Sequence, residues 1–271
     1  MLLLAAQARA DFTFGAFGDT PYIDSEERDF MSMIAHINAA APAFTIHVGD
    51  FKSSWTPCTD ELFLRRREQF GMFQAPLVYV PGDNEWQDCG RGGGPTRDPL
   101  ERLERLRTLF FAEPRSLGRQ ALALVRQNAQ YPEHVRWEHE GVLFVTLNAP
   151  GARNNHLMPR EARPRKQAMD SWVAGAFAEA RQRGLRGVVI AMQANPFLTG
   201  NVVREDFDSP MRVIQNESLS YAGEVLLIHG DTHRYRIDQP LFEARSRKPV
   251  ANFTRLEVFG YRLEEHTSEL Q

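Results

Sequence analysis

Acidic side chains recur in this sequence where short apolar runs end. The runs are typical of buried strands, and four of them lead into "FGDTPY", "HVGDFKSSW", "PGDNEW" and "HGDTH". The side chains that could do chemistry there are Asp19, Asp50, Asp83, Glu85, Asp231 and His233. A single Gly-Asp after a strand is often only a turn. Four of them in one chain predict a shared site.

The chemistry expected of such a set is cation binding. In α/β folds the ligand crevice lies beyond the carboxyl ends of the strands, so these strand ends would meet at one rim. Like charges held in one crevice repel each other unless a cation lies between them. Carboxylates with one or two imidazoles suit Mn²⁺, Mg²⁺, Fe or Zn²⁺. We therefore predict a divalent metal site, with polar strand ends and turns as the alternative.

Strand-like and helix-like patterns alternate along the chain, which predicts a layered α/β architecture with a mixed sheet. Strands are expected at 12–19, 44–50, 76–83, 187–196, 224–233 and 250–260, and a hairpin at 134–148 turning at Glu140-Gly141. Helices are expected at 25–40, 59–73, 98–112 and 161–183. Asp98 is the expected N-cap of its helix, with Pro99 at the first helical position.

The bulk composition is that of an ordinary soluble globular protein. The chain has 271 residues, of which 42% are hydrophobic and 25% charged. A net charge of −3 gives no electrostatic case for nucleic acid or an anionic membrane as partner. No apolar run approaches the roughly 18 residues that a membrane span needs. With no repeat or convincing linker, one domain at 11–263 is expected.

The two ends of the sequence differ from this domain. Residues 1–10, "MLLLAAQARA", end in an Ala-x-Ala pattern and predict the remnant of a signal peptide, and hence a periplasmic or secreted bacterial protein. A frayed apolar start is the alternative. Residues 264–271, "EEHTSELQ", have no apolar period and resemble the translation of a sequencing adapter. We expect a non-native tail there and a truncated C-terminus.

The two cysteines, Cys58 and Cys89, follow two different predicted strands. In an oxidising compartment such a pair is a disulfide candidate, whereas two free thiols are the alternative. A bridge would join the loops that follow Asp50 and Asp83 and would order them without taking part in the chemistry.

The motif order over nearly all of 12–260 resembles that of the calcineurin-like metallophosphoesterases, in a bacterial exported branch with few histidines. The quoted pieces "GDNEW", "MQANP" and "HGDTH" carry this resemblance. It implies an α/β fold in which a mixed β-sandwich is flanked by helices, in four layers αββα. It also implies two metal ions and hydrolysis of a phosphomonoester or phosphodiester by a metal-bound hydroxide.

The resemblance assigns metal ligands position by position. Asp50 would bridge the two ions, and His233 would keep its usual role. Gln193 of "MQANP" would stand in for a histidine. The full set of expected ligands is Asp19, Asp50, Asp83, Gln193, Asp231 and His233. At least four histidines of the usual set are absent, so the site favours Mn²⁺, Mg²⁺ or Ca²⁺ over Zn²⁺.

Catalytic and substrate-side residues follow in the same way. Asn84 falls where the family commonly has a catalytic histidine, with Glu85 beside it, and loss of that general acid typically costs about 10²–10⁴-fold. His229 would compensate if the turn brings it to the rim, and a core histidine is the alternative. Lys52, Asn148 and Asn154 are the substrate-binding candidates, and a solvated loop lysine is the alternative for Lys52.

Two other functions remain open at this point. One is a catalytically weak or inactive member that binds a metal or ligand, which the missing histidines favour. The other is a protein whose acids bind Ca²⁺ only to order loops. The sequence names neither the substrate, the metal nor the oligomeric state.

Overall fold

Two β-sheets lie face to face in the computed structural model, which describes residues 11–90, 97–197, 202–243, 246 and 248–260. The first sheet is parallel, in the order β1-β2-β3. Its strands are β1 Gly15–Phe17, β2 Thr45–His47 and β3 Leu77–Tyr79. The predicted signal-peptide remnant and the predicted tail at 264–271 lie outside the described residues.

The second sheet is mixed, in the order β4-β5-β6-β7-β8-β10-β9. Strands β6, β7, β8 and β10 run parallel, and β4, β5 and β9 are antiparallel to their neighbours. The strands are β4 Val125–Arg126, β5 Val135–His139, β6 Val142–Thr146, β7 Gly187–Ala191, β8 Glu224–His229, β9 Arg236–Asp238 and β10 Phe253–Glu257.

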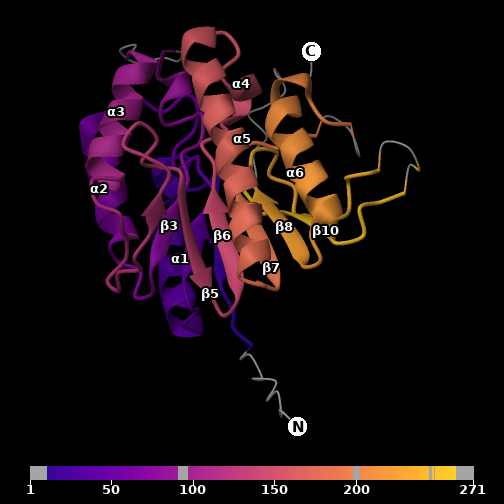
Figure 1. Cartoon of the computed structure of the whole chain (residues 1–271). Coiled ribbons are helices and arrows are strands. Elements are labelled where there is room, and N and C mark those ends of the chain that lie inside the picture. Colours follow the sequence, from indigo (N-terminus) through magenta and orange to yellow (C-terminus); the bar gives the residue numbers. More distant parts are fainter. Residues whose placement is uncertain (1–10, 91–96, 198–201, 244–245, 247, 261–271) are drawn as a thin grey trace.

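Helices cover the outer face of each sheet (Figure 1). The α-helices are α1 Glu27–Ala40, α2 Asp60–Phe70, α3 Pro99–Phe110, α4 Gly151–Asn154, α5 Pro159–Gln182 and α6 Asp208–Ser220. Short 3₁₀ turns are η1 Asp24–Glu26, η2 Gln87–Gly90 and η3 Glu205–Phe207. Helices α1, α2 and α3 pack on the three-stranded sheet, and α5 and α6 pack on the seven-stranded sheet.

Three hydrophobic clusters show the layering. Successive side chains of a strand point to opposite faces, so Ile46 and Val78 face the second sheet while Tyr79 faces the helices. Trp137 and Phe144 of the second sheet complete the cluster between the sheets. This four-layer α/β/β/α arrangement confirms the predicted fold class.

Local sequence signals account for several element boundaries. Asp98 caps α3 by accepting hydrogen bonds from the backbone N–H groups of Leu100 and Glu101, as expected. Glu140 and Gly141 both have positive φ, as a tight turn between β5 and β6 requires. Helix α6 was missed, because "DSPMRVIQNESLS" has few apolar residues. Only a narrow stripe that includes Met211 and Ile214 reaches the core.

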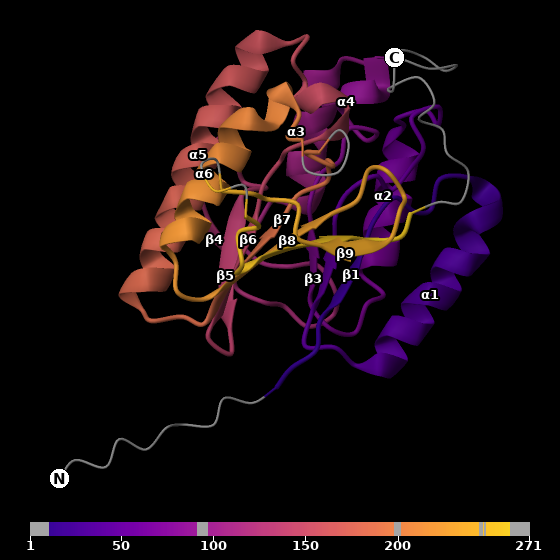
Figure 2. The ribbon, with the colours of Figure 1, turned by 90° about the vertical axis from the view of Figure 1, so that its right-hand side faces the viewer.

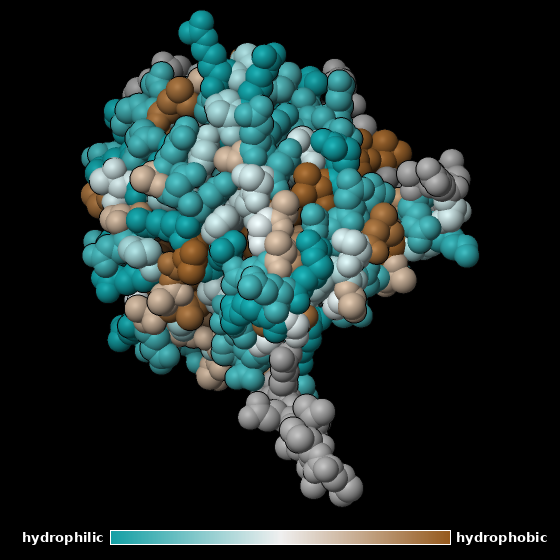
Figure 3. Space-filling model, in the orientation of Figure 1, coloured by the Kyte–Doolittle hydropathy of each residue, from teal (hydrophilic) through white to brown (hydrophobic). Residues whose placement is uncertain are grey.

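The face that carries α3, α5 and α6 is mainly hydrophilic, with apolar side chains scattered singly or in small groups (Figure 3). Among the helices that the structure describes, none combines the length and the apolar character that a bilayer crossing demands.

Fully buried His47 gives a first test of the packing. Its Nδ1 accepts from the backbone N–H of Gly49 at 3.0 Å, and burial lowers its pKa to about 3. In the unfolded chain the imidazole of His47 is protonated below pH ~6.5, whereas in the folded chain it stays neutral. The unfolding free energy therefore decreases as the pH falls from 7 towards 4.

In the wild type, His47 should lower the unfolding free energy by about 2 kcal/mol as the pH falls from 7 to 5. We therefore expect the unfolding free energy of His47→Asn to fall by about 2 kcal/mol less over the same pH range. Urea unfolding of both proteins at the two pH values measures this difference. An equal pH dependence in wild type and variant would contradict the account.

Candidate functional site

Four aspartates from four strand ends come together in the interior. Asp19 follows β1, Asp50 follows β2, Asp83 follows β3 and Asp231 follows β8, and all four side chains are buried. The first three strands are parallel and side by side, so their carboxyl ends lie at one edge. The structure therefore brings these four residues together, as predicted.

Two glycines of the four Gly-Asp pairs, Gly82 and Gly230, make room for an acid from another loop. A Cβ atom on Gly82 would lie 2.0 Å from Asp50 Oδ1, and a Cβ atom on Gly230 would lie 2.0 Å from Asp19 Oδ2. Real atoms do not approach so closely, so only glycine admits the neighbouring carboxylate. The recurring Gly-Asp spacing thus has a steric reason.

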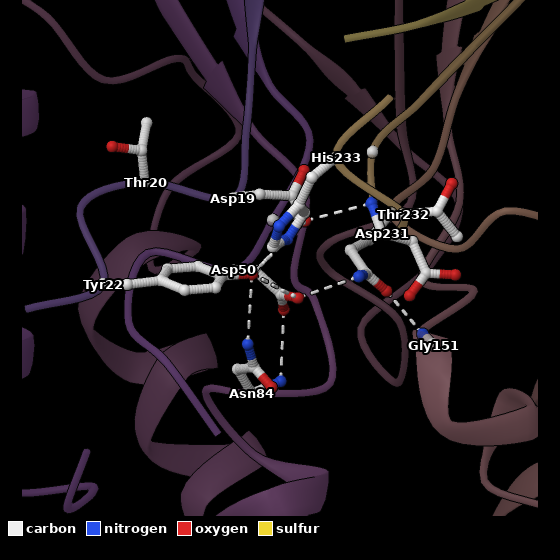
Figure 4. A network of polar contacts seen from close by, with 12 residues as sticks. Asp19, Thr20, Tyr22, Asp50, Asn84, Gly151, Asp231, Thr232 and His233 are labelled. Atoms are coloured by element: carbon white, nitrogen blue, oxygen red, sulfur yellow. Dashed lines mark hydrogen bonds and ion pairs between the residues drawn. The ribbon is translucent and has the colours of Figure 1, made fainter. Parts of the chain in front are cut away.

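Tyr22 is the centre of the site, and its hydroxyl lies among the candidate ligands (Figure 4). The hydroxyl oxygen is 3.0 Å from His233 Nε2 and 3.5 Å from both Asp19 Oδ1 and Asp50 Oδ2. Asn84 Nδ2 approaches the same oxygen at 3.4 Å. The phenol thus lies between Asp50 and the imidazole, while His233 Nε2 also lies 3.5 Å from Asp19 Oδ1.

Backbone and amide groups hold the carboxylates in place. Asp231 N donates to Asp19 Oδ1 at 3.0 Å, and Asn84 N donates to Asp50 Oδ1 at 3.1 Å. Gln193 Nε2 donates to Asp50 Oδ2 at 2.9 Å, while its oxygen accepts from the N–H of Gly151. Gln193 points its nitrogen at Asp50, so its predicted ligand role would need the amide to turn over.

Glu85 fixes the two central loops relative to each other. Its carboxylate accepts from Asp50 N at 3.0 Å, from Gly82 N at 2.9 Å and from the hydroxyl of Tyr79 at 2.6 Å. These partners belong to the loops after β2 and β3 and to β3 itself. In this structure Glu85 positions the loops, and its predicted catalytic role remains a prediction.

The electrostatics of the site are dominated by repulsion among buried acidic groups. Burial, and then repulsion from Asp83, Glu85, Asp19 and Asp231, raise the pKa of Asp50 well above its usual range. Burial also raises the pKa of Glu85. Such a site favours anything that brings positive charge.

Lys52, in the loop after β2, is a buried cation whose charge interacts with these acids. Burial lowers its pKa to about 8, against the pull of Glu85, Asp88 and Asp50. Its Nζ donates to Ser53 O at 2.8 Å. The solvated-lysine alternative is therefore wrong, because the side chain is buried.

The donor set matches a hard divalent cation. Asp19 Oδ2 and Asn84 Oδ1 are buried and accept no hydrogen bond from the described residues. Oxygen donors with one imidazole are what Mn²⁺ and Mg²⁺ prefer. In the described part of the chain, however, no three His, Cys, Asp or Glu side chains are already arranged around one ion position. The residues fit the chemistry, and metal binding requires movement, first of the Tyr22 hydroxyl.

His229 is placed in the core, the alternative to a position at the rim, because the chain turns directly after it. Strand β8 ends at His229, and Asp231 and His233 have φ values of 81° and 57°, which turn the chain. His229 Nδ1 lies 2.8 Å from Gly230 O, and burial lowers its pKa to about 3. It is a buried neutral histidine, so at pH 7 it is not the imidazolium that a general acid would require.

Asn148 and Asn154 belong to a buried polar network. Asn148 Nδ2 donates to Glu133 at 2.9 Å, and Asn154 Oδ1 accepts from Arg165 at 2.7 Å. Arg165 also donates to Asn148 O and pairs with Glu161. These bonds fix the loop that carries Gly151, and the predicted substrate contacts of both asparagines remain predictions.

The disulfide Cys58–Cys89 is present, as predicted. It links the loop before α2 to the η2 turn, so it closes the two segments that follow Asp50 and Asp83. The sequence offered no comparable signal for Tyr22. Only the Pro-Tyr of "GDTPY", placed three residues after Asp19, could have drawn attention to it.

Removing the central hydroxyl should increase the response to metal. We expect Tyr22→Phe to lower the unfolding free energy in chelator by about 1–3 kcal/mol, because Asp19 and Asp50 lose a donor. Mn²⁺ should then raise the melting temperature of the variant more than that of the wild type, since a ligand stabilises the state that binds it.

Tyr221→Phe is the matched control, because its hydroxyl donates to Leu185 O at 2.6 Å at the opposite end of β8. It should leave the Mn²⁺ response unchanged. A smaller Mn²⁺ shift in Tyr22→Phe than in the wild type would contradict the central position of the phenol.

Removing the bridge should cost stability. We expect Cys58→Ser with Cys89→Ser to lower the unfolding free energy by about 3–4 kcal/mol, because the disulfide closes a loop between cysteines 31 positions apart in the sequence. Urea unfolding measures the loss, with each single variant as a check. Two free thiols by mass spectrometry of protein from an oxidising compartment would contradict the bridge.

Comparison with known proteins identifies the fold. Neither a protein-family model nor a curated protein sequence matches the chain. The chain is similar to a dimetal phosphatase from Danio rerio, at 11% identity and a TM-score of 0.56, covering 92% of this chain and 87% of that one. It is also similar to a purple acid phosphatase from yellow lupin, at 11% identity and a TM-score of 0.51. That match covers 91% of this chain and 43% of the lupin chain.

A third solved structure is GAP50, the anchor in the inner membrane complex of Plasmodium, at 9% identity and a TM-score of 0.54. The match covers 91% of this chain and 70% of that chain. At such low identity these likenesses establish the architecture alone. The chain has the fold of the metallophosphoesterases, with its four aspartates at the strand ends of that fold.

Proposed function

We propose that this protein is a metal-dependent phosphoesterase that hydrolyses a phosphomonoester or phosphodiester. The observation that carries the proposal is the buried meeting of Asp19, Asp50, Asp83 and Asp231 beside His233, in a fold shared with dimetal phosphatases. Holding four buried acids together is unfavourable in free energy because they repel each other. Divalent cations would offset this repulsion and would activate water for hydrolysis.

The proposed ligands are these five residues, joined by Gln193 once its amide oxygen turns towards the ions. When bound, about two divalent ions would supply Lewis acidity to the phosphoryl oxygens and to the attacking water. The protein supplies the geometry: Glu85 holds the loops of Asp50 and Asp83 together through Asp50 N and Gly82 N.

The substrate side of the proposal rests on Lys52 and Asn84. Lys52 would attract the phosphoryl group, because it is the buried cation whose charge already acts on Asp50. Asn84 Nδ2, now 3.4 Å from the Tyr22 hydroxyl, would donate a hydrogen bond once that hydroxyl moves. Asn84 has no ionisable proton at the position where the resemblance implies a general acid, so we propose slow turnover of substrates with poor leaving groups.

A second candidate is a binding protein that keeps the fold without hydrolysis. The Tyr22 hydroxyl lies where the acids and His233 converge, which favours a site that is closed to metal. GAP50 has the same architecture and is described as an anchor. Activity with metal separates the two candidates.

We also propose that the protein is exported, as the Ala-x-Ala pattern at 8–10 predicts. The disulfide Cys58–Cys89 favours an oxidising compartment such as the periplasm. Residues 11–263 would then form the mature domain.

The activity test uses p-nitrophenyl phosphate and bis(p-nitrophenyl) phosphate with Mn²⁺, Mg²⁺, Zn²⁺ or Ca²⁺. We expect metal-dependent hydrolysis and a loss of at least about 100-fold in kcat/KM for Asp50→Asn, since even residues that merely support metal ligands cost 10–100-fold. The variant should stay folded by circular dichroism.

Asp170→Asn is the matched control, because Asp170 lies on α5 and accepts from Ser209, outside the site. It should keep wild-type activity. Folded protein that hydrolyses neither ester with any of the four metals would instead favour the binding protein.

A further inference from the structure

A cavity of about 1120 Å³ lies between α1, β1 and the strands β9 and β10. In Figure 2, α1 lies to the right of β1 and β9. The lining of the cavity is mostly apolar and includes Ala16, Phe17, Met33, Ile237 and Leu256. The proposed reaction makes no use of this cavity.

The cavity runs around the edge of β1. Ala16 and Phe17 are adjacent, so their side chains point to opposite faces of the sheet, yet both line the same space. Ala16 packs in the cluster between the sheets and Phe17 in the cluster under the helices. A space that touches both faces of a strand must pass its edge.

The hydrogen-bonding groups of that edge face the cavity. Gly15 N donates to Phe44 O at 2.9 Å, and Phe17 O accepts from Val48 N at 2.8 Å, so Gly15 and Phe17 bond towards β2. These groups alternate sides along a strand, so the N–H and C=O of Ala16 point away from β2. In the described sheet, β1 is an edge strand paired with β2 alone.

Exposed apolar side chains flank this edge. Ile237 of β9 is 61% exposed, and Tyr235 and Phe259 are 52% and 69% exposed. The rings of Tyr235 and Phe259 stack on each other, with their centroids 4.7 Å apart. All three line the cavity. An open strand edge with an apolar rim is a template for another strand.

The charge of the rim indicates what kind of strand fits. The charged residues that line the cavity are Glu26 and Asp29, both acidic. A partner with basic residues would complement them. The segment 261–271, "YRLEEHTSELQ", carries three glutamates and one arginine, which makes it a poor electrostatic match.

We propose that this cavity binds an extended segment of another polypeptide, which adds as a strand to the free edge of β1. The segment has apolar residues at alternate positions, to fill the space lined by Met33, Ile237 and Leu256, and basic residues near Glu26 and Asp29. Main-chain bonds to Ala16 provide affinity and the alternate pockets provide specificity. This interaction is independent of the proposed hydrolysis.

The test is selection from a displayed library of nine-residue peptides in which every second position is Val, Ile, Leu or Phe and the others vary freely. We expect peptides with Lys or Arg at the free positions to be enriched on the wild-type chain. Fluorescence anisotropy with a labelled selected peptide should show binding at least tenfold weaker to Ile237→Lys. Leu157→Lys, at a site 69% exposed and outside the cavity, should bind as the wild type does.

N-methylation distinguishes strand addition from simple apolar contact. Methylating the alternate amides that face β1 should weaken binding at least tenfold, whereas methylating the other set should leave it unchanged. The proposal would be overturned if no peptides were enriched on the wild type relative to Ile237→Lys. It would also be overturned if the two sets of N-methyl groups weakened peptide binding equally. At least tenfold tighter binding after deletion of residues 261–271 would overturn it too, because the chain's own tail would then be the occupant.

Discussion

Mutual repulsion of four buried aspartates is the constraint on which the rest of the structure depends. Asp19, Asp50, Asp83 and Asp231 come from separate strand ends and are held within reach of each other's charge, as the raised pKa of Asp50 reflects. Folding does not gain from such an arrangement, because buried like charges are unfavourable. The protein must therefore hold the acids in place by other means, and the site has to serve a purpose other than stability.

The surrounding groups supply that support in three ways. Close glycines let the loops approach, and Gly82 and Gly230 leave space for a neighbouring carboxylate. Glu85 ties the loops after β2 and β3 by their backbones, and the disulfide closes them further out. The Tyr22 hydroxyl then fills the point where the carboxylates and His233 meet. This is a preorganised frame whose centre, between Asp19, Asp50 and His233, is occupied by a phenol.

Much of this was predictable because it depends on periodicity and strand ends. The apolar runs before each Gly-Asp pair mark buried strands, and parallel strands bring their carboxyl ends to one edge, so the meeting of the four aspartates followed. The order of motifs also predicted the four-layer fold. The Cys58–Cys89 disulfide was predicted as a candidate from the expected oxidising compartment, with two free thiols as the alternative, and the structure contains the bridge.

The remainder depends on conformations that periodicity does not encode. The left-handed φ of Asp231 and His233 breaks the alternation that would have placed His229 beside them. Tyr22 reaches the centre through the path of the loop after Asp19, and Glu85 turns to backbone groups instead of the rim. Loops after strand ends decide which atoms meet, and a single sequence specifies those loops only through the whole fold.

The most direct test of the central claim is the metal content of the purified protein after saturation with Mn²⁺ and removal of loosely bound ions, measured by inductively coupled plasma mass spectrometry. Close to two ions per chain, with a clear loss in Asp50→Asn, is the predicted result. Retention of no Mn²⁺, and of no Mg²⁺, Zn²⁺, Fe or Ca²⁺ when these are supplied instead, would contradict it. The four aspartates would then be a buried acidic cluster without a cation, and the proposed hydrolysis would lose its basis.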